Sequence, residues 1–360
     1  MKIAVLGGGN GSAAAALDLA EQGHEVRLWR RNAEGIAALR DRDNTLTLKD
    51  YEGARPVRIA LATTDMAQAL EGAALVVCPT PATAQPDIAR AMAPYLADGQ
   101  VVFLPPGSFG SVLMAQVLRA EGNTADVTFA EAGTLPYLTR WHGADTVAIT
   151  TRATGLPTGV FPRRNAARAL EVIAQAFPSV RDCGDALSGA LMNAGPIIHP
   201  PLIVMNAGPI EHFEHWDIHN EGTQPAIRRV TTRLDGERMA LREALGYGAP
   251  HWPLADHYDP QAEWMYGAAA HEKLTDSGDW RETLVLREHR YMREDVACGL
   301  AFLVSVADWA GVPAPTARGL LAIGSAVCEA DFAREGRTLA SMGLDGLDRD
   351  AMRDLLERGL

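Results

Sequence analysis

The chain has 360 residues, of which 47% are hydrophobic, and it carries a formal net charge of −12 at pH 7. This length suggests two domains, and the apolar fraction is ordinary for a globular protein with a sizeable core. The acidic balance argues against nucleic acid and anionic membrane as partners. No apolar stretch reaches the ~18 residues of a membrane-spanning helix, and the first apolar run ends in glycines after Leu6, unlike a signal peptide.

Cysteine usage indicates the redox compartment. The residues lie far apart and form no CxxC pair, which is typical of reduced, mostly buried thiols in a cytoplasmic protein. The cysteines are Cys78, Cys183, Cys298 and Cys328. We therefore expect a cytoplasmic location.

A dinucleotide-binding motif begins the chain. The apolar run 3–6 leads straight into a glycine loop, and an alanine-rich helical segment follows at 13–21. In such a unit Gly7 makes the tight turn, Gly9 lets the backbone approach a pyrophosphate, and the helix N-terminus attracts the anion. Ser12 replaces the usual third Gly or Ala and is small enough to fit. The expected cofactor contacts are Gly7, Gly9, Asn10, Gly11 and Ser12.

The end of the second predicted strand, 25–29, indicates which dinucleotide binds. NAD sites usually place an acid here for the ribose 2′-hydroxyl, whereas this strand is followed by Arg30 and Arg31. Two guanidinium groups suit a 2′-phosphate. The pattern favours NADP and leaves NAD possible. The alternative is a solvated pair of surface arginines.

The first half of the chain alternates predicted strands and helices. Helices are expected at 88–96 and 112–119, with a second glycine loop at 105–110 between them. Strands are expected at 57–61, 75–79, 101–104, 127–130 and 147–150. This alternation predicts an α/β fold with a doubly wound parallel sheet, a Rossmann domain. The loops after Leu6, Leu104 and Ala130 should meet at its ligand crevice.

The second half shows helical spacing instead. Segments 223–245, 283–311 and 316–335 carry apolar residues at intervals of three and four, and 246–260 is a loop rich in Pro, Gly and Asp. The sequence predicts a Rossmann domain over 1–186 and an all-helical domain over 187–360.

Two regions of the helical half could carry acid–base chemistry. His199 lies in an apolar segment, where a histidine is more often a hydrogen-bonded core residue, but nearby prolines and Gly195 predict a kinked helix that could aim its ring into a cleft. Arg290, Glu294 and Asp295 would lie on partly overlapping helix faces. They could bind a substrate carboxylate and orient a histidine, or form ordinary ion pairs on a solvated face.

A metal site is the third possibility. His212, His215 and His219 have the spacing of one helical face, as zinc ligands sometimes do. No HExxH is present, however, and residues 220–222 read as a helix break. We expect no metal.

These residues together carry a family resemblance. In order along nearly the whole chain, the motifs resemble those of the octopine/nopaline (opine) dehydrogenase family. They are the N-terminal glycine loop, Asn193…Pro196…His199-Pro200, Glu221-Gly222-Thr223, Asp235…Glu237-Arg238, Arg290-Tyr291…Glu294-Asp295…Gly299-Leu300, and Glu335-Gly336-Arg337-Thr338-Leu339. The related glycerol-3-phosphate dehydrogenases and ketopantoate reductases use a lysine of the helical domain. None of Lys2, Lys49 and Lys273 lies in the stretch 187–245.

The resemblance implies a reaction. An opine dehydrogenase joins an amino acid or amine to a 2-keto acid such as pyruvate and reduces the C=N bond with NAD(P)H. Its catalytic His–Asp pair matches His199 and Asp295, and Arg290 would bind a substrate carboxylate. Thr134, Tyr137 and Trp216 are expected to line the substrate pocket.

Other interpretations stay open. They are an imine or keto-acid reductase on the same scaffold and a non-catalytic NAD(P)-sensing protein. The oligomeric state is also open, with a homodimer as one option.

Overall fold

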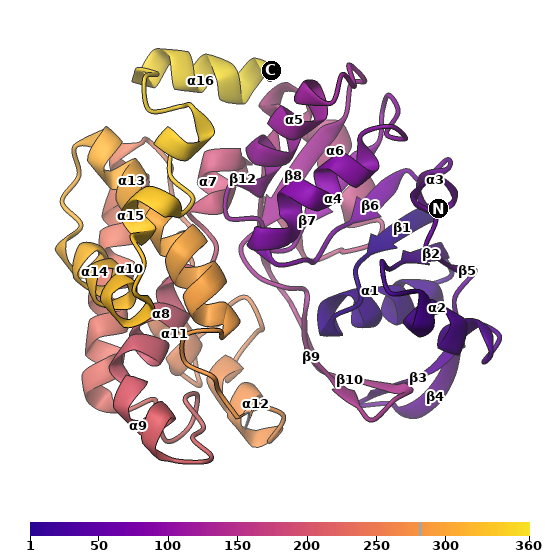
Figure 1. The fold of residues 1–360 in the computed structure, drawn as a ribbon, viewed down its shortest axis with the longest axis horizontal. Helices are drawn as coiled ribbons and strands as arrows, with labels where there is room; N and C mark the ends of the chain where they lie inside the picture. Colours follow the sequence, from indigo (N-terminus) through magenta and orange to yellow (C-terminus); the bar gives the residue numbers. More distant parts are fainter. Residues whose placement is uncertain (281–282) are drawn as a thin grey trace. The chain divides into compact units, whose positions relative to one another are not determined.

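The computed structural model describes residues 1–280 and 283–360 (Figure 1). Their contacts divide the chain into two compact units. The first comprises Met1–Thr80, Ala84–Ala190 and Leu355–Leu360, and the second comprises Pro81–Thr83 and Leu191–Asp354. The division near residue 190 lies close to the expected boundary at 186, which remains a prediction. Two short segments, Pro81–Thr83 and Leu355–Leu360, belong to the unit that is distant from them in sequence. Nothing in the neighbouring sequence predicts this assignment.

The first unit is built on an eight-stranded sheet. Neighbouring strands are parallel except for one antiparallel pair, β8 and β11. The order across the sheet is β12 (Val180–Asp185), β11 (Leu156–Phe161), β8 (Thr128–Ala132), β7 (Val101–Leu104), β6 (Leu75–Val77), β1 (Lys2–Leu6), β2 (Glu25–Trp29) and β5 (Leu61–Thr63). The central strands are apolar along both faces because helices cover both sides. This arrangement confirms the predicted Rossmann architecture.

Helices surround the sheet, as Figure 1 shows for α4, α5 and α6 beside the central strands. The helices of this unit are α1 (Asn10–Glu21), α2 (Ala33–Arg40), α3 (Met66–Leu70), α4 (Gln85–Met92), α5 (Gly110–Ala120), α6 (Ala166–Ala174) and α7 (Ala186–Ala190). Four consecutive alanines of α1, residues 13–16, are almost wholly buried. Their small side chains let α1 pack closely against strands on either side of it.

A second, four-stranded sheet packs on α1. Its order is β4 (Gly53–Arg58), β3 (Thr45–Asp50), β10 (Thr146–Arg152) and β9 (Tyr137–His142). Two sequence expectations are corrected here. The strand expected at 147–150 belongs to this small sheet, and the single strand expected at 57–61 is split. The Ile59 N–H donates to the carbonyl of Asn44, which directly precedes β3 of the small sheet, whereas the Ala60 N–H donates to the carbonyl of Val26 in β2 of the large sheet.

The second unit is helical apart from one isolated bridge between Trp264 and Gly267 in its described part. This confirms the predicted all-helical second half. Its helices are α8 (Gly195–Met205), α9 (Ala207–His212), α10 (Pro225–Ala244), α11 (Leu254–Tyr258), α12 (Ala270–Asp276), the π-helix η3 (Tyr291–Leu300), α13 (Ala301–Ala310), α14 (Pro315–Cys328) and α15 (Phe332–Glu335). The last helix, α16 (Arg349–Arg358), begins in this unit, and its residues from Leu355 onward belong to the first unit.

The expected helix at 283–311 is the main departure in this unit. Residues 283–289 are not helical, and a π-helix precedes α13. The expected helix at 316–335 is interrupted after Cys328, and the expected loop at 246–260 contains the short helix α11.

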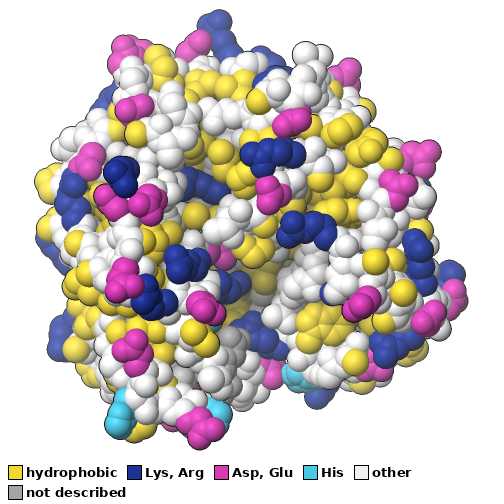
Figure 2. All heavy atoms as spheres, in the orientation of Figure 1, with side chains coloured by type: hydrophobic (Ala, Val, Ile, Leu, Met, Phe, Trp, Pro, Cys, Tyr) yellow, Lys and Arg dark blue, Asp and Glu magenta, His cyan; other side chains and the backbone are white. Residues whose placement is uncertain are grey.

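Charged side chains of both signs lie on the surface. On the face drawn in Figure 2, acidic and basic side chains are interspersed. Among the described residues, no helix combines the length and the apolar character needed to cross a bilayer.

Candidate functional site

The first glycine loop joins β1 to α1 with the geometry of a tight turn. Gly7 has φ +116°, and a Cβ placed on it would lie 2.6 Å from Oγ of Ser12. That hydroxyl donates a hydrogen bond to the Leu6 carbonyl at 3.2 Å. Ser12 therefore ties the start of α1 to the end of β1, and Gly7 must stay bare for this closure.

The remaining loop residues differ in what they face. A Cβ on Gly9 would meet nothing within 4 Å, so this backbone is open to a ligand. A Cβ on Gly11 would press on Leu135 at 2.7 Å, which makes Gly11 a packing position. The Asn10 side chain accepts a hydrogen bond from the Trp141 N–H at 2.9 Å. Asn10 thus anchors the loop to β9.

The two arginines after β2 have different surroundings. Arg30 donates to the Gly8 carbonyl at 3.3 Å, and its Nε is buried without a hydrogen-bond partner in the described structure. Arg31 is exposed. The next residue, Asn32, caps α2 by accepting from the Gly35 N–H at 3.2 Å. A buried, unsatisfied guanidinium atom beside the glycine loop fits a phosphate ligand.

The second glycine loop is organised by a residue that the sequence analysis missed. Glu131, at the end of β8, is fully buried. Its carboxylate accepts from the Phe109 N–H at 2.7 Å and from the Ser111 hydroxyl at 2.6 Å. Gly107 leaves room for this carboxylate, because a Cβ there would collide with it. An acid at the end of an apolar strand was the available signal.

In the second unit the structure brings His199 and Asp295 together. His199 lies on α8 and Asp295 on η3, and Nδ1 of the imidazole is 2.8 Å from Oδ2 of the carboxylate. Gly195 makes this approach possible, since any Cβ there would collide with Asp295. Pro200 and Pro201 lie inside α8 and cannot donate backbone hydrogen bonds, as the expected irregular helix requires.

Tyr291 and His219 complete the surroundings of this pair and were missed as site residues. The Tyr291 ring stacks on the His199 imidazole, with centroids 3.6 Å apart and planes 9° from parallel. The Tyr291 hydroxyl lies 3.0 Å from Nε2 of His219. The His199 ring is therefore held at its edge by Asp295 and across its face by Tyr291.

The π-helix explains why several residues of one short segment serve this site. Its hydrogen bonds join residues five apart, so such residues lie over one another, and π-helical turns are frequent at functional sites. Arg290, just before η3, is five residues from Asp295 and is exposed. Its guanidinium carbon lies 5.4 Å from the Tyr291 ring centre. The α-helical spacing expected for this segment would have turned these groups further apart.

The carboxyl groups of η3 are unusually basic. Burial raises the pKa of Asp295 to about 7, against the opposing charges of Arg290 and His289. Burial also raises the pKa of Glu294 to about 7, and the Asp295 charge adds to it.

Glu294 holds a short backbone segment of the same unit. It accepts a hydrogen bond from the Ala82 N–H at 2.9 Å, and Arg337 donates to the Ala82 carbonyl at 2.8 Å. Glu294 and Arg337, both in motifs that resemble those of the family, thus hydrogen-bond to the backbone of Ala82 in the segment Pro81–Thr83.

Other motif residues are structural. Arg238, on α10, donates to the buried Asp235 carboxylate at 2.6 Å. Glu237 accepts from the Thr316 and Ala317 N–H groups at the start of α14.

The residues expected to line the substrate pocket differ in exposure. Thr134 is partly exposed in the loop after β8. Tyr137 is 2% exposed, and its hydroxyl donates to Asp18 at 3.0 Å. The Tyr137 side chain is thus engaged inside the first unit, and its contact with substrate stays a prediction. Trp216 is half-buried and donates its indole N–H to Asn206 at 2.9 Å.

The three clustered histidines are not on one helical face. α9 ends at His212, and His215 lies in the irregular stretch after it. Both are exposed, whereas His219 is buried. In the described part of the chain, no group of three His, Cys, Asp or Glu side chains is arranged to hold a metal ion.

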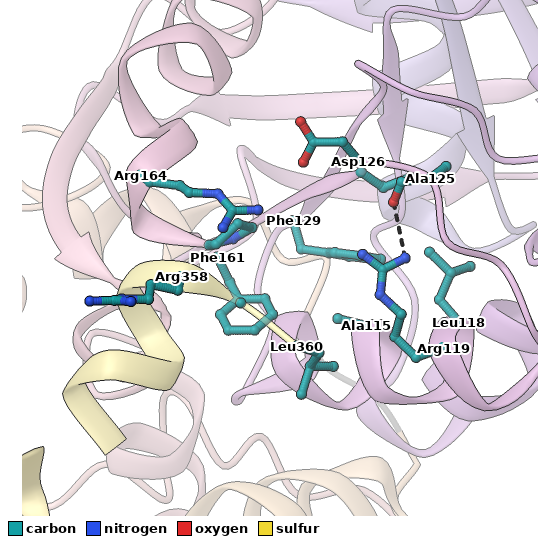
Figure 3. A pocket seen from close by; sticks show the side chains of 13 residues that line it. Ala115, Leu118, Arg119, Ala125, Asp126, Phe129, Phe161, Arg164, Arg358 and Leu360 are labelled. Carbon is teal, nitrogen blue, oxygen red and sulfur yellow. Dashed lines mark hydrogen bonds between the residues drawn. The ribbon is translucent and has the colours of Figure 1, made fainter. Parts of the chain in front are cut away.

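One further pocket lies in the first unit, between α5, the loop after β11 and the last residues of the chain (Figure 3). Arg119 lies on its wall and donates to the Ala125 carbonyl at 3.1 Å. This pocket does not include the glycine loops.

Comparison with known proteins places these sites in context. Residues 182–328 match the family NAD/NADP octopine/nopaline dehydrogenase, alpha-helical domain. Residues 2–105 match NAD-dependent glycerol-3-phosphate dehydrogenase N-terminus. The chain is 28% identical over 362 residues to an opine dehydrogenase of Arthrobacter sp. (strain 1C), and the alignment covers 98% of each chain.

Solved structures show the same fold. An octopine dehydrogenase with NADH and L-arginine has a TM-score of 0.72 at 21% identity, covering 99% of this chain and 98% of that one. Yersinopine dehydrogenase with NADP+ bound has a TM-score of 0.64 at 17% identity, covering 99% and 97%.

Proposed function

Because this chain belongs to the octopine/nopaline dehydrogenase family, we propose that it catalyses the reductive condensation of an amino acid with a 2-keto acid such as pyruvate. Condensation of the amine with the carbonyl forms an imine and releases water. Protonation of the imine nitrogen and addition of a hydride to the imine carbon then give a secondary amine with two carboxylates. The reduced nicotinamide, when bound, supplies the hydride.

The observation that carries this proposal is the His199–Asp295 pair with Tyr291 stacked on it. Asp295 engages Nδ1, so proton exchange with the substrate falls to Nε2. The pair can take a proton from the substrate ammonium group, which frees the amine to attack the carbonyl, and can return a proton to the departing hydroxyl. Asp295 fixes one imidazole tautomer and stabilises the imidazolium form.

Arg290 supplies substrate binding next to this pair. Its guanidinium is exposed, and its charge reaches Asp295, whose pKa it lowers against the effect of burial. A planar guanidinium can hold a carboxylate through two parallel hydrogen bonds. Arg290 would bind the carboxylate of the keto acid.

The first unit would hold the dinucleotide. Gly9 is open to a pyrophosphate, Gly7 and Ser12 set the turn, and the N-terminus of α1 attracts the phosphate charge. We infer a preference for NADP, which Arg30 and Arg31 support through their position after β2. The family relation supports NAD(P) as the cofactor class in either case.

A kinetic experiment tests the function. Oxidation of NADPH should require both pyruvate and an amino acid, and the secondary amine should be identified by mass spectrometry. Turnover with pyruvate alone would indicate a keto-acid reductase, and turnover only with preformed imines would indicate an imine reductase. His199→Ala should lower turnover by about 10²–10⁴-fold while NADPH binding is retained. Binding of NADPH without any turnover would indicate a sensing protein.

A further inference from the structure

Arg228 is a cation without a counter-ion in the described structure. It lies on α10, with its guanidinium carbon 4.8 Å from the centre of the Tyr258 ring. Its Nε is buried and has no hydrogen-bond partner in the described part of the chain, and no described carboxylate forms an ion pair with it. This Nε–H group is under-satisfied, because burial removes water that the protein does not replace.

The groups around Arg228 do not supply the missing negative charge. The Tyr258 ring lies 4.9 Å from that of His271, which lies 5.4 Å from that of His257. Burial, with help from Arg228, lowers the pKa of His271 to about 4. Burial lowers the pKa of His257 well below its ordinary value. Both rings are therefore neutral at pH 7, and Arg228 keeps its charge among neutral rings.

A second unsatisfied group lies on the same helix. Thr231 is 1% exposed, and its hydroxyl has no hydrogen-bond partner among the described residues. It is three residues from Arg228, a spacing that places two side chains on one helix face. A guanidinium and a hydroxyl on one face are a donor set for a carboxylate.

Helix packing and electrostatics both connect this cluster to the proposed catalytic pair. The helix α10, which carries Arg228 and Thr231, packs against α8, which carries His199. After burial, the pKa of His257 is lowered further by four nearby groups that are positive when protonated. These groups are His271, His219, Arg228 and His199, in order of decreasing effect. His257 thus lies within electrostatic range of both Arg228 and His199.

We propose that Arg228, with Thr231, binds the carboxylate of the amino-acid substrate. This assignment rests on the proposed function, whose product carries two carboxylates. Arg290 beside Asp295 takes the carboxylate of the keto acid, and Arg228 takes the other. The aromatic rings of Tyr258 and His271 form the wall beside that second carboxylate.

The test compares amines that differ only in this group. Each L-amino acid is paired with the amine that lacks its carboxylate, for example L-phenylalanine with 2-phenylethylamine and L-arginine with agmatine, and pyruvate is the second substrate. Arg228→Ala and Arg228→Lys are measured beside Arg229→Ala, a matched control because Arg229 is the exposed neighbour on the same helix. Arg228→Ala should raise KM for the amino acid about tenfold or more.

The KM values for the other substrates distinguish a loss of carboxylate binding from a general disruption of the fold. KM for pyruvate and for the carboxylate-free amine should stay near the wild-type values, and Arg228→Lys should lie between wild type and Arg228→Ala. An equal rise in KM for the amino acid and for the carboxylate-free amine would overturn the assignment. A rise in KM for pyruvate alone, or the same rise in KM for the amino acid in Arg229→Ala, would also overturn it. Thermal unfolding without ligand should show no loss of stability in Arg228→Ala, since an uncompensated cation is removed.

A direct binding measurement keeps this result distinct from failure of the proposed function. The wild-type protein with NADPH is titrated calorimetrically with the same amino acids and amines. Amino-acid binding that weakens in Arg228→Ala supports the carboxylate site even if no turnover is found. Equal binding by both proteins, or no amino-acid binding by wild type, overturns it.

Discussion

The Tyr291 ring lies flat against the imidazole of His199, with centroids 3.6 Å apart, and its hydroxyl is held by His219. The imidazole is therefore confined in two perpendicular directions, since Asp295 holds its edge. A stacked aromatic ring can also favour the imidazolium through its negative face. Tyr291 is best regarded as a positioning residue for His199.

This role makes a prediction for two Tyr291 variants. Tyr291→Phe keeps the stacking and loses only the hydroxyl contact, so kcat should change little. Tyr291→Leu removes the stacking and should lower kcat on the order of 10-fold to 10²-fold, because small displacements of a catalytic group are costly. The pH profile of kcat should also shift in Tyr291→Leu. A loss of stability with an unchanged kcat and pH profile would mean that Tyr291 serves only the core.

The cofactor preference predicts a selective effect of Arg31. Arg31→Ala should raise KM for NADPH about tenfold or more and leave KM for NADH nearly unchanged, because only NADPH carries the 2′-phosphate. Arg90→Ala, an exposed position on α4, is the control. Equal effects of Arg31→Ala on both cofactors would argue for the solvated-pair interpretation.

The glycine loop predicts opposite outcomes at two of its positions. Gly9→Ala adds a methyl group into open space, so stability without cofactor should change by less than about 0.5 kcal/mol, whereas NADPH binding should weaken strongly. Gly7→Ala is strained by its positive φ and collides with Ser12, so it should lower Tm even without cofactor. Gly236→Ala, an uncrowded glycine of α10, controls for the substitution itself. NADPH titration and thermal unfolding measure both effects.

Glu294 predicts a pH dependence of stability. Its pKa is about 7 in the folded protein and starts from 4.5, so between these values the folded state holds a proton that the unfolded chain has lost. The free energy of unfolding must then fall as pH rises through this window, by about 1.4 kcal/mol for each pKa unit. Glu294→Gln removes this titration, and its carbonyl can still accept from Ala82. The fall in Tm between pH 5 and pH 8 should be smaller in this variant.

The control is Glu288→Gln, an exposed glutamate just before η3. It should retain the wild-type dependence of Tm on pH. Identical slopes for wild type and Glu294→Gln would show that Glu294 is charged in the folded protein throughout this range.

Local patterns in the sequence were sufficient to predict the Rossmann core. The glycine loop and the apolar strands express short-range rules, so β1, α1 and β2 could be placed from a few residues each. The small sheet could not be predicted, because its strands pair across distant parts of the chain. Thr146 pairs with Thr47, for example, and the few residues around either position give no sign of this partner.

The site in the second unit also depends on residues that are distant in sequence. His199 and Asp295 are separated by 96 positions in sequence, and only the family resemblance paired them. Tyr291 was visible beside Arg290, but an aromatic residue in a helical segment is usually a core residue. The π-helical winding that aligns these groups has no signature in residue spacing. Arg228 was missed because its environment is assembled from α10, α11 and α12.

The grip of Glu294 and Arg337 on Ala82 limits how the protein can be divided. A fragment that began at Leu191 would contain both side chains without the backbone segment that they hold. The Glu294 carboxyl, in the helix η3 that also carries Asp295, would then lose the Ala82 N–H as its hydrogen-bond donor. We therefore expect the helical half to be less stable when it is produced without residues 81–83. Chimaeras that exchange it between relatives must also carry residues 81–83 with it.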